Sequence, residues 1–350
     1  MTTLTETAYY TRRAINWLIL GIVAYIVLRI VFGILALVWV AIFPPKPPPP
    51  NHAFGKLPAL QFPKQASYSG QLVFQLQTIQ GAVPAASPSA TVYFMPKAAP
   101  SLLGLNQAQN FAKNLQFDPT PIQISKNIYR FNDPTLPFRT LAFDIISSNF
   151  VLKYDYTREL SLFAEKNLPT ADDAQQQTLN MLQQYSLGHD DISGGTTTVS
   201  YFKLTGDGLT PTTSLSQADA ERVDLFRKSI GNTPLFTPIP DQGPISIIFS
   251  GSSNPNKRII QFAYTYWPID YQTTATYPLK TSAEAWNELQ QGNGYIARFP
   301  TNTNTVIVRN VYLGYYDSFD AQIYLQPIFV FEGDNGFLGY VPAVLPLWTE

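Results

Sequence analysis

The chain has 350 residues, with 24 acidic side chains, 23 basic ones, two histidines and no cysteine. A net charge of -1 gives no electrostatic case for a nucleic-acid partner. The lack of cysteine excludes disulfides, a cysteine nucleophile, thiolate zinc sites and iron–sulfur clusters, and two histidines exclude a multi-histidine metal site.

Residues 14–43 are almost wholly apolar, with Arg29 as their one charged side chain. A helix of this length measures about 45 Å, which exceeds a hydrocarbon core of roughly 30 Å. Trp17 and Trp39 would then lie near the two membrane interfaces. The run is too long for a signal peptide and lacks a small-x-small cleavage site, so we predict an uncleaved transmembrane helix at 14–43.

The charges beside this helix bear on its orientation. Arg12, Arg13 and the amino terminus precede it, whereas Lys46 and Lys56 follow it, which slightly favours a cytoplasmic tail at 1–13. Charged residues make up 13% of the chain, against about 25% in soluble domains. We therefore predict a single-pass protein of the cell membrane whose remaining domains are extracytoplasmic.

A proline-rich linker is predicted at 44–67, because 44–50 is all proline except Lys46. Such a segment favours polyproline II at about 3.1 Å per residue and acts as a stiff spacer. We expect 51–66 to continue as irregular chain.

A first α+β domain is predicted at 68–160. Segments 71–77 and 90–94 alternate apolar and polar side chains, which predicts a pair of strands. Helical spacing follows at 105–115. Strand patterns then recur, and the predicted antiparallel sheet buries one face under that helix and leaves the other in water. These strand patterns lie at 122–124, 128–131, 140–145 and 150–154.

A second α+β domain is predicted at 165–350. Capping patterns at 170–173, 216–219 and 281–284 each predict the start of a helix. Strands are expected at 196–204, 245–249, 259–266, 305–312 and 323–331. Asn335-Gly336 predicts a tight hairpin turn between 324–331 and 337–341. The fold class is thus one N-terminal transmembrane helix plus two extracytoplasmic lobes of antiparallel sheet with helices on one face.

Three segments could carry chemistry, and each has a simpler explanation. His189-Asp190-Asp191 could supply a general base, but it reads as a polar turn after a helix. Ser200 and Lys203 match a Ser-x-x-Lys motif, yet they lie in a predicted strand, where they would point to opposite faces. The acidic segment 332–336 could suggest calcium, but the hairpin turn explains it. We therefore expect no catalytic residue, no metal and no cofactor.

Arg29 is different, because a guanidinium at the bilayer centre costs at least about 2.5 kcal/mol. On a helix it lies on one face with Gly21, Tyr25, Gly33 and Ala36, and small residues let another helix approach. Two interpretations stay open. Arg29 pairs with an acidic group of another membrane helix, or it snorkels toward one interface.

The C-terminal region resembles a known family. Segments 282–289 (Ser-Ala-Glu-Ala-Trp-Asn-Glu-Leu), 311–316 (Val-Tyr-Leu-Gly-Tyr-Tyr) and 324–329 (Tyr-Leu-Gln-Pro-Ile-Phe) resemble the C-terminal module of YycH/YycI-type membrane-anchored accessory proteins, which contain PepSY-like modules. The resemblance implies one membrane helix and an extracytoplasmic α+β body. It also implies a regulator of a sensor histidine kinase without catalytic residues of its own.

We expect a non-enzymatic envelope protein that regulates another membrane protein or assists its assembly, with the lipid bilayer and that protein as partners. A cell-wall or glycan-binding structural module is the alternative, and a hydrolase using His189 is a further one. A row of exposed aromatic side chains along a groove would favour glycan, and a compact patch would favour protein.

Overall fold

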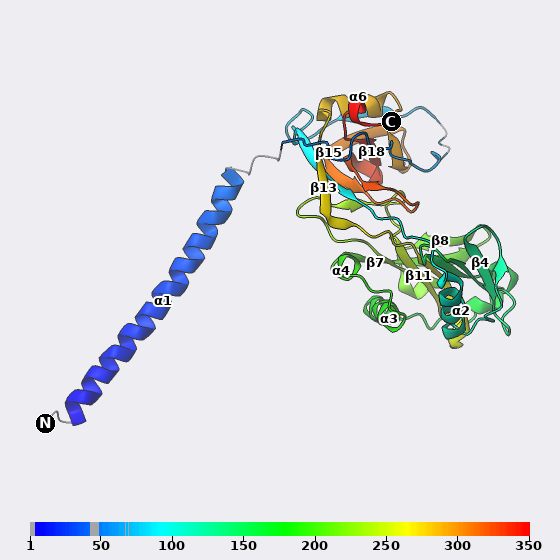
Figure 1. Cartoon of the computed structure of the whole chain (residues 1–350), viewed down its shortest axis with the longest axis horizontal. Coiled ribbons are helices and arrows are strands. Elements are labelled where there is room, and N and C mark those ends of the chain that lie inside the picture. The colour runs from blue at the N-terminus through cyan, green and yellow to red at the C-terminus, as the bar shows by residue number, and fades with distance from the viewer. Residues whose placement is uncertain (1–3, 43–48, 67, 69) are drawn as a thin grey trace. The chain divides into compact units, whose positions relative to one another are not determined.

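The computed structural model describes residues 4–42, 49–66, 68 and 70–350. The chain forms two compact units, Met1–Pro48 and Pro49–Glu350, and each is described by itself. The first unit is one helix, α1 (Leu4–Ile42), and the second is a sheet-rich body (Figure 1). The coarse prediction of a mixed α+β protein with one apolar N-terminal helix is confirmed.

Helix α1 contains a 20-residue stretch, Trp17–Ala36, that is long and apolar enough to cross a membrane. The helix begins at Leu4, so it takes in most of the segment predicted as a cytoplasmic tail. It ends at Ile42, one residue before the predicted limit. The predicted proline spacer at 44–48 lies outside the described residues.

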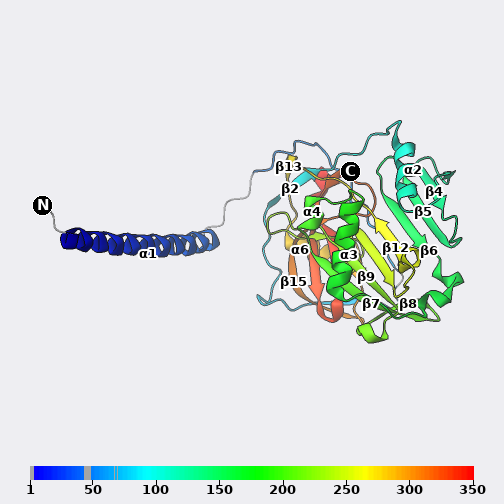
Figure 2. The same ribbon diagram turned by 90° about the horizontal axis from the view of Figure 1, so that it is seen from below.

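A nine-stranded antiparallel sheet forms one half of the body (Figure 2). Strands that are distant in the sequence are adjacent in this sheet because their apolar faces together form one hydrophobic surface. Its order is β3 (Ile122–Gln123), β4 (Ile128–Asn132), β5 (Arg139–Asp144), β6 (Phe150–Tyr154), β12 (Ile259–Tyr264), β11 (Ile245–Ser250), β9 (Ala220–Leu225), β7 (Thr197–Thr205) and β8 (Gly208–Thr212).

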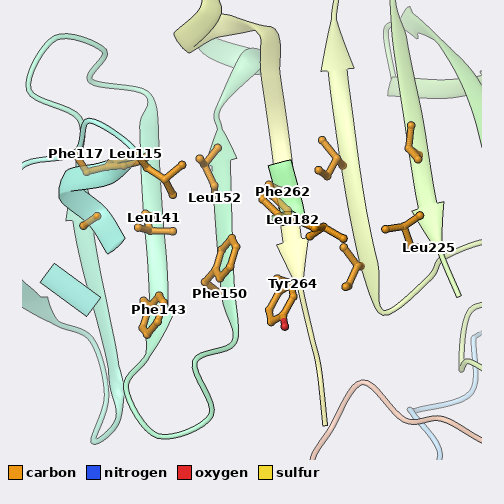
Figure 3. Packing of buried hydrophobic residues seen from close by; sticks show 14 of the residues in the cluster. Leu115, Phe117, Leu141, Phe143, Phe150, Leu152, Leu182, Leu225, Phe262 and Tyr264 are labelled. Atoms are coloured by element: carbon orange, nitrogen blue, oxygen red, sulfur yellow. The ribbon is translucent and has the colours of Figure 1, made fainter. Parts of the chain in front are cut away.

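Three helices cover one face of this sheet: α2 (Gly104–Asn114), α3 (Ala171–Gln184) and the short α4 (Asp190–Ser193). Ala108 and Ala112 of α2 and Leu182 of α3 are buried against it. Figure 3 shows apolar side chains from neighbouring strands in one layer. Burial of these apolar side chains stabilises the nine-stranded half of the body by roughly 25 cal/mol per Å² of apolar surface removed from water. The layer includes Leu141, Phe143, Phe150, Leu152, Leu225, Phe262 and Tyr264.

The other half of the body contains two further sheets. Helix α6 (Ser282–Gln290) packs on strand β18 (Leu338–Pro342), and its Trp286 and Leu289 join the core of this half. The six-stranded sheet has the order β1 (Val73–Leu76), β15 (Thr305–Tyr316), β17 (Pro327–Gly333), β18 (Leu338–Pro342) and β14 (Tyr295–Arg298), with β10 (Leu235–Phe236) also pairing with β15. The three-stranded sheet has the order β13 (Asp270–Pro278), β2 (Ser89–Phe94) and β16 (Tyr324–Leu325).

The remaining elements are short. They are α5 (Pro255–Arg258) and the 3-10 turns η1 (Tyr156–Arg158), η2 (Leu160–Phe163), η3 (Leu215–Gln217), η4 (Asp334–Gly336) and η5 (Pro346–Trp348).

The predicted division into domains at 68–160 and 165–350 is not confirmed, because the sheets cross it. Strand β6 pairs with β12, so strands from both predicted domains form one continuous sheet. Conversely, β1 and β2 belong to the sheets built from the C-terminal part of the chain. The chain therefore enters the body in one half, builds the nine-stranded sheet, and returns.

Two local predictions are wrong. Strands β1 and β2 form as predicted, but they do not pair with each other: β1 pairs in parallel with β15, and β2 pairs with β13 and β16. The helix predicted after Ser216 is strand β9, which is hydrogen-bonded on both sides, to β7 and β11. Alternating apolar and polar residues predict a strand but not the strand with which it pairs. Hydrogen bonding to a strand on each side outweighs weak helical spacing in the sequence.

The predicted linker is also shorter than expected, because its described part, 49–66, is bound to the body. The backbone N–H groups of Asn51 and His52 donate to the Thr276 carbonyl at 3.1 and 3.2 Å. Leu57 is fully buried and pairs with Thr349 as a short parallel bridge. Thus 49–66 is irregular, as expected, but it is part of the fold.

Local predictions with strong cap or turn signals are confirmed. Thr170 caps α3 through the Asp173 N–H, and Thr281 and Glu284 form a full capping box on α6. Helix α2 and strands β3 to β7 lie where their periodicity indicated, whereas strand β8 was not predicted. The Asn335-Gly336 turn joins β17 to β18, with φ of 56° and 75° at its two residues.

Candidate functional site

The predicted partner-binding face of α1 lies on a helix whose described side chains are exposed. Gly21, Tyr25, Arg29, Gly33 and Ala36 recur at intervals of three or four residues, so they occupy one face. A Cβ added at Gly21 or Gly33 would meet nothing within 4 Å. This face is therefore sterically open to a second helix.

The densest buried polar cluster of the described body surrounds Arg227, a residue that the sequence did not single out. Its guanidinium contacts the Asp191 carboxylate, and its Nε donates to Asp317 Oδ2 at 3.0 Å. Nη2 donates to the Trp267 carbonyl at 2.5 Å, and the guanidinium lies 4.5 Å from the Tyr266 ring centroid.

The electrostatics of this cluster are those of a paired buried charge. Burial alone would lower the pKa of Arg227, but Asp317 and Asp191 together hold that pKa above its ordinary value. Burial raises the pKa of Asp317, and Arg227 opposes that rise. Each of the three guanidinium nitrogens donates to a protein acceptor, so Arg227 fastens α4 and the nine-stranded sheet to the end of β15.

His189 lies at the edge of this cluster, just before α4. Its ring stacks on Tyr266 at 3.6 Å between centroids, and its Nε2 is 3.0 Å from the Tyr264 hydroxyl. Burial lowers the pKa of His189, although Asp191 acts in the opposite direction. Asp191 is engaged by Arg227, so the histidine has a tyrosine and not a free carboxylate as its immediate partner.

The other two motifs are placed as their simpler explanations predict. Ser200 and Lys203 lie on β7, three residues apart and thus on opposite faces. Lys280 donates to both carboxylate oxygens of Glu288 at 2.8 and 2.7 Å. Asp334 of the hairpin turn accepts two hydrogen bonds from Arg309, at 2.9 and 2.6 Å. Over the part of the chain that the structure describes, no group of three or more His, Asp or Glu side chains could hold a metal ion.

The surface aromatics of the body bear on the glycan alternative. Tyr271, 39% exposed, is the one aromatic side chain among the largely exposed apolar residues of the described body. Most other rings stack against one another inside it, as Phe62 does on Tyr295 and Tyr68 on Phe299. Among the described residues of the body, 49–66, 68 and 70–350, neither a row nor a compact patch of exposed rings is therefore present.

Comparisons with known proteins add little. No family model matches the chain, and no curated protein matches it either. Among solved structures, an uncharacterized protein from Eubacterium rectale is similar over 78% of this chain and 87% of its own, at 12% identity and a TM-score of 0.38. That similarity supports no conclusion about function.

Proposed function

We propose that this chain is a non-enzymatic, single-pass membrane protein that binds another membrane protein as its regulator or assembly partner. In this proposal α1 crosses the cell membrane and the body lies outside the cytoplasm. A sensor kinase is the kind of partner that the resemblance to YycH/YycI-type proteins implies.

The observation that carries the proposal is the position of Arg29 within the apolar stretch Trp17–Ala36. An unpaired guanidinium near the bilayer centre is costly, and such residues in membrane helices usually face a partner or a cavity. Here the same face carries Gly21 and Gly33, where a second backbone could approach closely. A helix with an intramembrane carboxylate fits both features.

The body supports this proposal because the polar groups around Arg227 and His189 are bonded to one another. Each guanidinium nitrogen of Arg227 donates to a protein acceptor, and His189 is stacked and hydrogen-bonded. Reactive groups usually converge on a cavity where substrate can reach them. A body with this arrangement is better suited to presenting a surface than to chemistry.

Membrane co-purification of the wild type, Arg29→Leu and Gly33→Leu at equal expression tests the proposal. Loss of the charge should weaken association by about 1 to 2 kcal/mol, or roughly 5- to 30-fold, while insertion improves. Gly33→Leu should also weaken association, by blocking close approach. Equal recovery of partner with all three chains would contradict the role of α1, and Val27→Leu on another face is the matched control.

Orientation has its own test, because the chain has no cysteine. Single cysteines at Thr3 and Asp207 should react with a membrane-impermeant maleimide from opposite sides of the membrane. Labelling of Asp207→Cys in intact cells supports an extracytoplasmic body, and labelling of Thr3→Cys instead would reverse the orientation.

A further inference from the structure

Strands β3 to β6 have a second face, opposite the one that α2 covers. Leu141 and Leu152 point to the covered face, so the alternate residues Ala142, Val151 and Lys153 point to the other. Large aliphatic side chains are exposed on this second face: Ile122 by 42%, Ile124 by 55%, Ile128 by 37% and Val151 by 40%.

The strand register makes these side chains neighbours. Ile122 lies opposite Arg130, Arg130 opposite Ala142, and Ala142 opposite Val151, so these residues form one row across four strands. Ile124 and Ile128 form the next row, where the Ile124 N–H donates to the Ile128 carbonyl at 2.9 Å. We call this the β3–β6 open face: Ile122, Ile124, Ile128, Arg130, Ala142, Val151 and Lys153.

The open face carries two basic side chains, Arg130 and Lys153, and one carboxylate, Asp144, which lies opposite Ile128. Arg130 lies within the apolar row, Lys153 lies opposite Thr140 in the adjacent row, and neither has an ion-pair partner among the described residues. Three nearby carboxylates already have partners. Asp144 accepts from the N–H groups of Ile146 and Ser147 at 2.8 and 3.2 Å. Asp133 pairs with Arg139 at 2.8 Å, and Asp155 pairs with Arg158 at 3.1 Å.

The surface is hollowed at these residues. A depression of about 700 Å³ is lined by Arg130, Thr140 and Lys153, among others. A second depression, of about 380 Å³, is lined on the same strands by Ile128, Ala142, Asp144 and Val151, and beyond them by Asp320 among others. Exposed aliphatic side chains grouped in this way are typical of protein interaction sites, since single exposed apolar residues scatter over ordinary surfaces.

Charge selects the occupant. A second copy docked face to face would set Arg130 and Lys153 against like charges, which is unfavourable, whereas a partner segment that carries carboxylates can pair with both.

We propose that the β3–β6 open face docks a protein partner through an apolar strip flanked by carboxylates that pair with Arg130 and Lys153. This inference rests on the proposed function and names the surface of the body that the same partner contacts.

Photo-crosslinking of the full chain in its native membrane tests this inference, again because the chain has no cysteine. A benzophenone maleimide is attached at Val151→Cys, or at Asp207→Cys in the exposed β7–β8 turn as the matched control. We expect Val151→Cys to crosslink one protein through a segment that contains Asp or Glu, and Asp207→Cys not to do so.

Charge reversal decides whether such a crosslink is specific. Arg130→Glu combined with Lys153→Glu should lower its yield about tenfold or more, and changing the crosslinked carboxylates of the partner to Lys should restore it. Ile122→Ser with Ile124→Ser should lower the yield as well. Both double variants should melt as the wild type does, because the changed side chains are exposed.

Crosslinks to a second copy, to lipid or to glycan would overturn the inference, as would a yield that charge reversal leaves unchanged or an equal yield at Asp207. These failures are distinguishable from failure of the proposed function. If Arg29→Leu loses the partner and the reversed open face keeps it, α1 alone makes the contact. If neither change affects recovery, the proposed function fails too.

Discussion

Arg227 and Asp317 are separated by 90 residues in the chain, yet Arg227 Nε donates to Asp317 Oδ2 at 3.0 Å in a fully enclosed site. The arginine follows β9 of the nine-stranded sheet, and the aspartate follows β15 of the six-stranded sheet. With Asp191 they form a buried ionic triad. The two halves of the body are thus joined by charges that neither half could bury alone.

Asp317→Ala should destabilise the body strongly, because it leaves part of the Arg227 charge buried without its partner. We expect a loss of about 3 to 5 kcal/mol in the free energy of unfolding, measured by urea denaturation. Asp155→Ala breaks the exposed pair with Arg158 and should cost less than about 1 kcal/mol. Similar losses for the two variants would contradict the structural role of the triad.

Glu221 should make stability depend on pH. It lies on β9 beneath α3, between Tyr201 of β7 and Phe249 of β11, and its two buried carboxylate oxygens have no hydrogen-bond partner in the part of the chain that the structure describes. Burial raises its pKa from 4.5 to about 7, and Asp173 of α3 adds to the rise. The folded state therefore holds a proton that the unfolded state releases between these two values.

The sign follows from proton binding: this contribution to stability is greatest below pH 4.5 and is lost as pH rises toward 7. That interval corresponds to about 3 kcal/mol. Glu221→Gln should remove the dependence, so the variant should gain on the wild type between pH 4.5 and 7.5 in denaturant unfolding. Asp207→Asn, an exposed control with the same charge change, should show no such gain. A constant difference between Glu221→Gln and the wild type across this range would refute the assignment.

Helix caps give a test with an internal control. Thr281→Ala removes the capping box of α6 and should cost about 1 kcal/mol of stability. Ser216→Ala alters a cap pattern that precedes strand β9 instead of an α-helix, so its effect in the same thermal melts should be much smaller. A comparable loss for Ser216→Ala would argue against the strand.

Leu57 should matter to folding although it lies in the segment predicted as a linker. Its side chain is fully buried in the core that contains Tyr277 and Val344. Leu57→Ala should therefore cost about 2 to 5 kcal/mol. Lys56→Ala, at the exposed neighbouring position, should change the unfolding free energy by less than about 0.5 kcal/mol. In the same way, a fragment that begins at Pro49 should be more stable than one that begins at Tyr68.

The candidate sites differ in how far the sequence could predict them. The α1 face around Arg29 could be predicted because a helix places residues three and four apart on one side. The open face could be predicted only in part, since alternation showed that one side of the strands would stay wet but not which strands would be neighbours. Arg227 gave no local signal, because its partners come from distant positions.

What the sequence by itself determined is whatever depends on neighbours along the chain: the apolar helix α1, the caps of α3 and α6, and the Asn335-Gly336 turn. The tertiary structure alone decided that β1 joins β15, that β9 is a strand despite its charged Glu221 and Asp224, and that 49–66 belongs to the body. Strand partners and buried charges are settled by which surfaces and opposite charges meet after the chain has folded back on itself. The spacing of residues along the sequence does not specify these long-range contacts.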